Sequence, residues 1–302
     1  MLNYKKKKYY WSTISSREES KSWSSYNKKF FKNEMKKKRL IPILLLQNGN
    51  LVQSKGFNSF QNLGNPIHAV KRLSQWGSDE LIYLDISRNN NYDIERDDLK
   101  YKNNSNFLSI IKEVSKVTFM PITIGGKIKN LKDVEKRLKI GADKVSVNSA
   151  ALENPKLISM IAKEFGSQCL VISIDVKLIQ NQYRIFSDGG SKISNYNLDE
   201  WIDIVTKNGA GEILINSIDR DGSKKGYDIK LLNSVQKRSK IPIIACGGVG
   251  NWQHFYEGFK KTNVDAVAAA NIFHHIDQSV YLSKKFLYEK KINIRKPDLL
   301  VV

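Results

Sequence analysis

Apolar, β-branched runs alternate with amphipathic stretches along most of the chain, and this alternation constrains the fold more than any other feature. The eight apolar runs lie at 40–46, 81–86, 119–124, 144–148, 169–175, 212–218, 241–246 and 265–270. The amphipathic stretches lie at 66–76, 105–117, 130–140, 155–165, 198–208, 228–239, 252–261 and 277–290. Eight strand–helix units predict an α/β fold of the (β/α)8 TIM-barrel type. A doubly wound open sheet is the competing fold, but it usually has fewer strands.

The two halves of this pattern are similar to each other. The segment "ITIGGKIKNLKDVEKRLKIGADKVSVNS" at 122–149 matches "IIACGGVGNWQHFYEGFKKTNVDAVAAAN" at 243–271. In both, an Asp follows the first Gly of a Gly pair at the same distance. A second pair is "WGSDELIYLDIS" at 76–87 and "NGAGEILINSID" at 208–219, where Gly and then Glu precede a strand. Because internal repeats reveal architecture, we predict a barrel with half-barrel duplication.

Residues 1–34 differ from the rest of the chain. They are rich in Lys, Ser and aromatic residues, and they show the period of neither a helix nor a strand. They contain no long apolar run, which argues against a secretory signal. Met35 stands directly before "KKKRLIPILLL". We expect the barrel to span 35–302, and residues 1–34 to be a disordered basic extension or the product of a mis-assigned start.

Composition narrows the class of function. The net charge is +20, which could indicate nucleic-acid binding. However, the lysines are scattered and accompany no nucleic-acid recognition motif. Lysines on solvated helix faces, or lysines that attract an acidic substrate, explain the charge better. No apolar run is long enough to span a membrane. The two cysteines and four histidines show no disulfide or metal-ligand spacing. We therefore expect a cytoplasmic protein with no metal, no cofactor and no nucleic-acid partner.

Glycine-rich and polar segments follow the predicted strands at the end where barrel enzymes bind ligands. Gly125-Gly126 and Gly247-Gly248 follow two strands related by the repeat, and Asn148-Ser149 and Ala270-Asn271 follow the next strand in each half. A Gly pair lets backbone N–H groups approach an anion, although a single pair is more often only a turn. Because the repeat duplicates the arrangement, we predict two opposed phosphate sites and a small-molecule substrate phosphorylated at both ends.

Carboxylates also stand at the strand ends, where burial can tune an Asp to act as a general acid or base. Asp175 closes the apolar run "LVISID" and is the best candidate, because the strand directs it toward the barrel mouth. Asp85 closes "LIYLD", and Asp221 follows the sixth strand. A loop cap or an ion pair with Arg220 is the alternative role for such residues. We expect Asp221-Gly222 to bind ligand through its backbone.

Four segments together resemble the HisF family, the cyclase subunits of imidazole glycerol phosphate synthase, and the resemblance covers about residues 36–297. They are "GADKVSVNSAALENP", "FGSQCLVISIDVK", "GAGEILINSIDRDGSKKGYD" and "IPIIACGGVG". The resemblance implies a half-barrel-duplicated (β/α)8 barrel that forms a heterodimer with a HisH glutaminase at its N-terminal face. Ammonia would pass through the barrel and react with a bisphosphorylated ribonucleotide, giving imidazole glycerol phosphate and an aminoimidazole carboxamide ribotide.

The resemblance implies roles for individual residues. Asp175 matches one of two catalytic aspartates. The positions that match phosphate loops are Asn148, Ser149, Asp221, Gly222, Gly247, Gly248, Ala270 and Asn271. The second catalytic aspartate should stand at the end of the first strand, where the family pattern is C-L-D-V-K-D-G. This chain has "ILLLQNG" at 43–49, so Leu45 replaces that aspartate.

Two further positions depart from the family pattern. Gln53 replaces a ligand-contacting lysine, although Lys55 is close by, and Lys127 replaces the third Gly of the first phosphate loop. A leucine at 45 cannot transfer a proton, so ordinary cyclisation is expected to be badly impaired.

The resemblance also implies an ammonia gate at the N-terminal end of the barrel. Its four charges correspond to Arg39, Glu80, Lys144 and Glu212, all of the expected sign. A purely structural ring is the alternative. A chain with a retained gate and an altered active site resembles a group of HisF-like paralogues. These paralogues work with a HisH-like glutaminase and a sugar amidotransferase in surface-polysaccharide synthesis.

Three functions are therefore considered. The first is an ammonia-conducting synthase subunit for amidination of a surface-polysaccharide sugar. The second is a true cyclase of histidine biosynthesis, which would use Asp175 and a substitute group. The third is a non-catalytic scaffold for the glutaminase.

Overall fold

The computed structural model describes residues 36–88, 92, 104 and 106–299. The chain divides into two units, Met1–Lys37 and Lys38–Val302, and the second unit contains the barrel. The predicted boundary after residue 34, with the extension that precedes it, lies outside the described residues.

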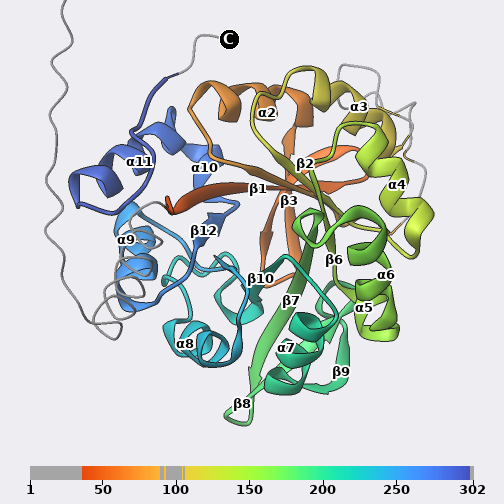
Figure 1. Ribbon diagram of the computed structural model, residues 1–302. Helices are drawn as coiled ribbons and strands as arrows, with labels where there is room; N and C mark the ends of the chain where they lie inside the picture. The colour runs from red at the N-terminus through yellow and green to blue at the C-terminus, as the bar shows by residue number, and fades with distance from the viewer. Residues whose placement is uncertain (1–35, 89–91, 93–103, 105, 300–302) are drawn as a thin grey trace, which may run out of the picture. The chain divides into compact units, whose positions relative to one another are not determined.

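Eight parallel strands close into a barrel (Figure 1). In spatial order they are β1 (Arg39–Gln47), β4 (Leu81–Asp85), β5 (Ile122–Gly125), β6 (Lys144–Val147), β7 (Leu170–Ile179), β10 (Glu212–Ser217), β11 (Ile243–Cys246) and β12 (Ala266–Ala269). Parallel pairing of β12 with β1 closes the barrel. Each strand coincides with one of the eight apolar runs, so the predicted (β/α)8 barrel is confirmed.

Eight helices connect the strands and surround the barrel (Figure 1). They are α2 (Pro66–Gln75), α3 (Phe107–Lys116), α4 (Leu131–Lys139), α6 (Lys156–Phe165), α7 (Leu198–Lys207), α8 (Ile229–Arg238), α9 (Trp252–Lys261) and α11 (Ser279–Glu289). Most begin after an Asn or Asp whose side chain accepts a hydrogen bond from the first turn, as Asn130 does from the backbone N–H of Asp133. In the part of the chain that the structure describes, no helix is long and apolar enough to span a membrane.

Short helical segments complete the connections, and the sequence pattern did not predict them. They are α5 (Ser149–Glu153), α10 (Ile272–His275) and the 3₁₀ turns η1 (Ser167–Cys169), η2 (Asp188–Gly190) and η3 (Ile218–Arg220). All but η1 follow the carboxyl ends of strands, so they shape the face of the barrel where ligands bind in this fold.

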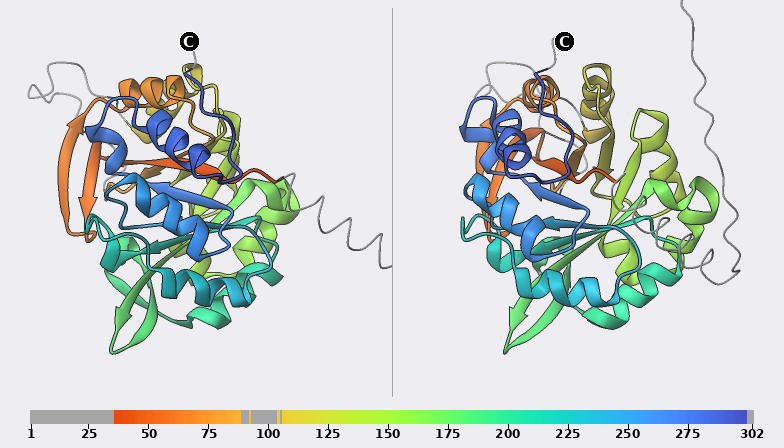
Figure 2. Two further views of the ribbon diagram at one scale, coloured as in Figure 1. Left: turned by 90° about the vertical axis from the view of Figure 1, so that its left-hand side faces the viewer. Right: turned by 60° about the vertical axis from the view of Figure 1, so that its left-hand side comes forward.

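Two antiparallel extensions were also not predicted. The first strand of each half continues past the barrel into an antiparallel extension. β1 pairs with β2 (Asn50–Lys55), which pairs with β3 (Ser59–Gly64). β7 pairs with β8 (Gln182–Ser187), which pairs with β9 (Lys192–Asn197). Asn48 and Gly49 form the tight turn between β1 and β2 with positive φ angles of 50° and 85°, as Asn-Gly hairpin turns require. In the left panel of Figure 2, β2 and β3 stand on the side of the barrel opposite the start of β1.

Two apolar clusters hold the barrel together. The larger lies between the strands and the helices, and Trp201, Tyr83 and Phe255 are among its fully buried side chains. The smaller lies inside the barrel and consists of Ile41, Ile43, Ile82, Val171, Leu214, Ile244, Ala266 and Ala268. Because side chains alternate along a strand, one strand supplies both clusters.

The internal repeat extends to individual hydrogen bonds. The carboxylate of Asp143 accepts from the backbone N–H of Ile122 at 2.8 Å, and Asp265 accepts from Ile243 at 3.1 Å. In each pair the backbone N–H of the Asp also donates to the carbonyl of the same Ile. These are the two aspartates that the sequence repeat aligns, and each joins one strand to the next.

A chain that begins at Met35 is expected to keep its melting temperature within about 2 °C of the full chain, a loss below about 1 kcal/mol. The reason is that residues 1–34 show no period that would place an apolar face on the barrel. Thermal unfolding of both chains, followed by circular dichroism, measures the difference. A much larger decrease would mean that the segment contributes to the folded core.

Candidate functional site

Asp175 lies at the carboxyl end of the barrel, buried within β7. Its Oδ2 accepts a hydrogen bond from Asn148 Nδ2 at 2.7 Å, and its Oδ1 accepts a longer one from Asn216 Nδ2 at 3.4 Å. Burial raises the pKa of Asp175 to about 7, with a further contribution from Asp221, although the two amide donors oppose the rise. A carboxyl group with this pKa exchanges protons readily near neutral pH, as a general acid or base must.

Leu45 occupies the corresponding place in the first half of the barrel. It begins the pairing of β1 with its hairpin, opposite Val52, as Asp175 begins the pairing of β7 with its hairpin, opposite Phe186. Leu45 is half-buried and packs against the apolar cluster inside the barrel. The two halves therefore present an ionisable side chain and an apolar one at equivalent positions.

The hairpin β2–β3 is fastened to the loops of the second half. Ser54 Oγ donates to Asp221 Oδ2 at 2.7 Å, and the backbone N–H of Phe57 reaches the same oxygen at 3.3 Å. Asn271 Nδ2 donates to the carbonyl of Ser54 at 2.7 Å. The side chains of Asp221 and Asn271 thus hold a hairpin that the sequence pattern did not predict, and Ser54 is a site residue that sequence reasoning missed.

The predicted glycine pairs lie at the carboxyl ends of β5 and β11, where other backbone segments approach closely. Gly126 has a φ of 96°, and a Cβ there would lie 2.2 Å from the carbonyl oxygen of Asp85. Gly248 has a φ of 102°, and a Cβ there would lie 2.2 Å from the carbonyl oxygen of Gly226. This packing accounts for the glycines without any ligand, so phosphate binding at Gly125-Gly126 and Gly247-Gly248 stays a prediction.

The polar residues after β6 are engaged with their neighbours. The amide of Asn148 holds Asp175, and Ser149 Oγ accepts a hydrogen bond from the backbone N–H of Asp188 at 2.9 Å. Asp188 belongs to η2, in the second hairpin. The structure thus brings Asn148, Ser149 and Asp175 to one place, while their predicted contact with substrate stays a prediction.

The residues that depart from the family pattern have partners of their own. Gln53 Oε1 lies 2.8 Å from His275 Nε2. Lys127 has a positive φ of 54°, and its ammonium lies 3.2 Å from Asp85 Oδ2, whose side chain is fully buried. Asp85 is therefore a counter-ion of Lys127, and its Oδ1 also accepts a hydrogen bond from the backbone N–H of Ser87 at 2.9 Å.

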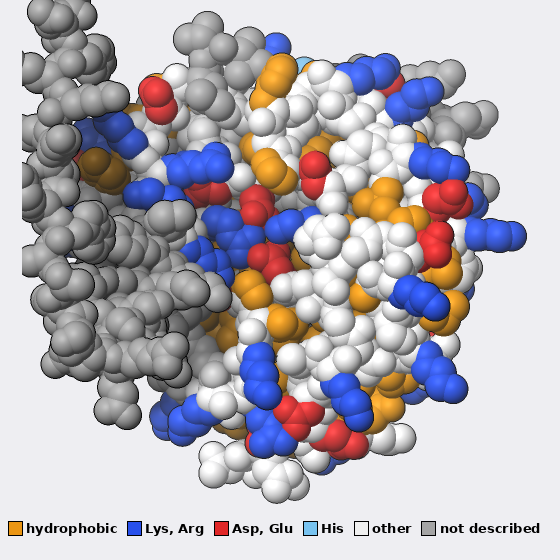
Figure 3. Space-filling model, viewed as in Figure 1, with side chains coloured by type: hydrophobic (Ala, Val, Ile, Leu, Met, Phe, Trp, Pro, Cys, Tyr) orange, Lys and Arg blue, Asp and Glu red, His pale blue; other side chains and the backbone are white. Residues whose placement is uncertain are grey.

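At the opposite end of the barrel, four charged side chains form a closed ring, here called the charged ring: Arg39, Glu80, Lys144 and Glu212. Arg39 Nη1 and Nη2 lie 2.6 Å from Glu80 Oε1 and 2.6 Å from Glu212 Oε1. Lys144 Nζ lies 3.1 Å from Glu80 Oε2 and 2.8 Å from Glu212 Oε2. Each carboxylate thus binds both cations. Figure 3 looks onto this face and shows basic and acidic side chains gathered near its centre.

Burial and the neighbouring charges shift the pKa values of Arg39 and Glu212 in opposite directions. Burial lowers the pKa of Arg39, but Glu212 and Glu80 outweigh it and hold that pKa above its ordinary value. Burial raises the pKa of Glu212, but Arg39 and Lys144 outweigh it and hold that pKa below its ordinary value. Each charge of the ring therefore lies beside charges of the opposite sign. The predicted ring exists, and its role as an ammonia gate stays a prediction.

A separate buried ion pair lies at the same end of the barrel. Lys284 Nζ of α11 lies 2.8 Å from Asp79 Oδ1, and both side chains are almost fully buried. Asp79 Oδ2 also accepts from the backbone N–H of Leu40 at 2.9 Å. The pair ties α11 to the start of β1, beside Glu80 of the charged ring, and sequence reasoning gave no signal for it.

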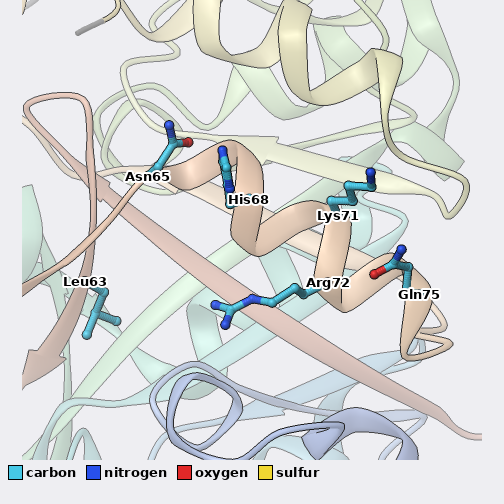
Figure 4. Close-up of a pocket in the computed structure, with 6 residues that line it drawn as sticks. All are labelled: Leu63, Asn65, His68, Lys71, Arg72 and Gln75. Atoms are coloured by element: carbon cyan, nitrogen blue, oxygen red, sulfur yellow. The ribbon is translucent and has the colours of Figure 1, made fainter. Parts of the chain in front are cut away.

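One open pocket lies away from this site. Its volume is about 420 Å³, and it lies beside β3 and α2 (Figure 4). It is lined by Leu63, Asn65, His68, Lys71, Arg72 and Gln75. In Figure 4, Lys71 and Arg72 point in different directions, so their charges do not converge on one ligand. We therefore take the strand ends around Asp175 as the candidate site.

Comparisons with known proteins agree with this architecture. The family described as "Histidine biosynthesis protein" matches residues 39–278. Similar proteins are each named "Imidazole glycerol phosphate synthase subunit HisF". The one from Natranaerobius thermophilus is 39% identical over 258 residues, covering 85% of this chain and 98% of the relative. The one from Streptococcus mutans serotype c is 38% identical over 262 residues, covering 86% of this chain and 100% of the relative. The chain therefore belongs to the HisF family of histidine biosynthesis proteins.

Proposed function

We propose that this chain is the synthase subunit of a glutamine amidotransferase complex. A HisH-like glutaminase binds the N-terminal face in a heterodimer and releases ammonia there. The ammonia passes through the barrel to a phosphorylated acceptor at the opposite end. The acceptor chemistry is amidination of a surface-polysaccharide sugar, carried out with a sugar amidotransferase.

The observation that carries this proposal is the charged ring followed by an apolar interior. The ring surrounds the entrance at the strand beginnings, and the cluster of Ile41, Ile82, Val171, Leu214 and neighbouring side chains lies beyond it. An apolar interior strongly disfavours a bare ammonium ion, whereas neutral ammonia loses far less on leaving water. The interior therefore favours transit of the neutral molecule, and Leu45 extends the apolar lining to the mouth.

A second candidate is the imidazole glycerol phosphate synthase reaction of histidine biosynthesis. The HisF relatives favour it, because the similarity covers almost the whole of each relative. Asp175, with its pKa of about 7, is suited to proton transfer in that reaction. This candidate requires another group to replace the carboxylate that is missing at Leu45.

A cyclase assay separates these candidates. The subunit with the bisphosphorylated ribonucleotide and an ammonium salt is expected to show near-background turnover, because loss of one general acid–base group typically costs about 10²–10⁴ in rate. Leu45→Asp is expected to restore part of the turnover if only that carboxylate is missing. Leu45→Asn is the matched control, since it is polar but cannot transfer a proton. Turnover like that of an ordinary cyclase in the unaltered chain would establish the histidine-pathway function and reject our proposal.

A further inference from the structure

Two aspartates after β10 each fasten one of the antiparallel extensions. Asp219 Oδ2 accepts a hydrogen bond at 2.7 Å from the backbone N–H of Leu178, near the end of β7. Asp221 Oδ2 accepts from Ser54 Oγ at 2.7 Å and from the backbone N–H of Phe57 at 3.3 Å. Both aspartates belong to the short connection around η3. One turn of the second half therefore holds an extension from each half of the barrel.

The β2–β3 hairpin also contacts two other connections of the second half. A Cβ on Gly190 of η2 would lie 3.0 Å from Cδ2 of Phe57, so the turn of the hairpin meets the connection between β8 and β9. Gln53 Oε1 lies 2.8 Å from Nε2 of His275, in α10 after β12. In the left panel of Figure 2, the turn of this hairpin lies beside loops of the second half. The hairpin is thus fastened at several places along its length.

The turn of the hairpin has a backbone conformation that these contacts help to hold. Gly56 and Phe57 both have a positive φ of 60°. A left-handed φ suits glycine but is unfavourable for a bulky side chain such as that of Phe57. The backbone N–H of Gly56 donates to the carbonyl of Asp221 at 3.2 Å, and that of Phe57 donates to its carboxylate. All of these partners belong to the chain itself, so docking of the hairpin requires no ligand.

From these contacts we infer that Asp221 is a positioning residue, whose carboxylate keeps the β2–β3 hairpin docked before the acceptor binds. The acceptor then meets a preformed mouth beside Asp175, because the hairpin is ordered during folding rather than during binding. The carboxylate serves the hairpin, which leaves the backbone of Asp221 as the part available to a ligand. Asp219 has the same role for the other extension. The inference deepens the proposed function and rests on it only in taking the strand ends as the acceptor site.

Hydrogen exchange of single backbone amides in the full-length chain without ligand, followed by NMR, tests the inference. The N–H of Phe57 should exchange at least about a hundredfold more slowly than in an unfolded chain. Asp221→Ala should speed that exchange by about tenfold to a hundredfold, the effect of losing a hydrogen bond to a charged group. Asp221→Asn should keep most of the protection, because its amide oxygen can still accept from Ser54 and Phe57.

Asp219→Ala is the matched control, because it removes an equal charge from the same turn. It should speed exchange at Leu178 and leave Phe57 protected. The amides of the barrel strands should keep their exchange rates in all three variants, which shows that the fold is intact.

Two kinds of result would overturn the inference. Rapid exchange of Phe57 in the unaltered chain, or protection that appears only after ribose 5-phosphate is added in excess, would show that the hairpin is not docked beforehand. Unchanged exchange in Asp221→Ala, equal loss of protection in Asp221→Asn, or an equal effect of Asp219→Ala would show that the carboxylate of Asp221 does not hold it. None of these measurements involves ammonia transfer or cyclisation, so a failure of the proposed function would be recognised separately.

Discussion

Lys144→Ala is expected to lower the free energy of unfolding at neutral pH by roughly 3 kcal/mol, the lower end of the range for breaking a buried ion pair. The substitution leaves Glu80 and Glu212 with Arg39 as their one remaining cation in the charged ring. The lower end applies because the side chain of Lys144 is 18% exposed and those of its partners 11%, so water screens part of the unbalanced charge. Urea unfolding of both chains measures the loss.

The same variant also tests the gate. With the glutaminase partner present, glutamine hydrolysis and ammonia delivered to the acceptor are measured together. If the charged ring controls entry, Lys144→Ala uncouples the two, and ammonia escapes to solvent. Lys284→Ala is the matched control, because it breaks the buried pair with Asp79 at the same end of the barrel and leaves the ring complete.

The comparison of these two variants decides between the gate and its alternatives. Both should lose stability, but only Lys144→Ala should change the ratio of hydrolysis to delivery. If the ratio stays at its original value in both, the ring is structural. The scaffold function also predicts an unchanged ratio, because a non-catalytic scaffold delivers no ammonia through its interior.

Asp175→Asn is expected to stabilise the folded chain above neutral pH. Burial holds the pKa of Asp175 near 7 in the folded state against an ordinary value of 3.8, so ionisation opposes folding. The stability that the neutral carboxyl group contributes is present at low pH and is lost as pH rises toward 7. A shift of this size corresponds to about 4 kcal/mol. The gain from Asn will be smaller, because its amide accepts only one of the two hydrogen bonds from Asn148 and Asn216.

Unfolding by urea across a pH series measures this effect. The difference between Asp175→Asn and the unaltered chain should grow between about pH 4 and pH 7 and stay constant above it. A difference that does not vary with pH would show that the carboxyl group has the same pKa in the folded and unfolded states, contrary to the shift described above. The variant should also lose any reaction that needs proton transfer by Asp175. A gain in stability with loss of activity is typical of a group retained for chemistry.

Local sequence pattern was sufficient to predict the framework of the barrel. Strands and helices are recognisable over about ten residues through their apolar spacing. The repeat pairs Asp143 with Asp265 on sequence alone, and both make the same strand-to-strand hydrogen bonds. The sequence also located Asp175 at a strand end, because an apolar strand that stops at a carboxylate directs it to the barrel mouth.

Only the tertiary structure decided the contacts between distant residues. The hairpins β2–β3 and β8–β9 escaped prediction because their outer strands, β3 and β9, are largely exposed and lack a regular apolar period. The bond of Ser54 to Asp221 and the ion pair of Lys284 with Asp79 join residues far apart in the chain. No local pattern specifies such pairs, since closure of the barrel brings them together. The pKa of Asp175 depends on the same closure, because burial by surrounding strands, rather than the residue type, moves it toward neutrality.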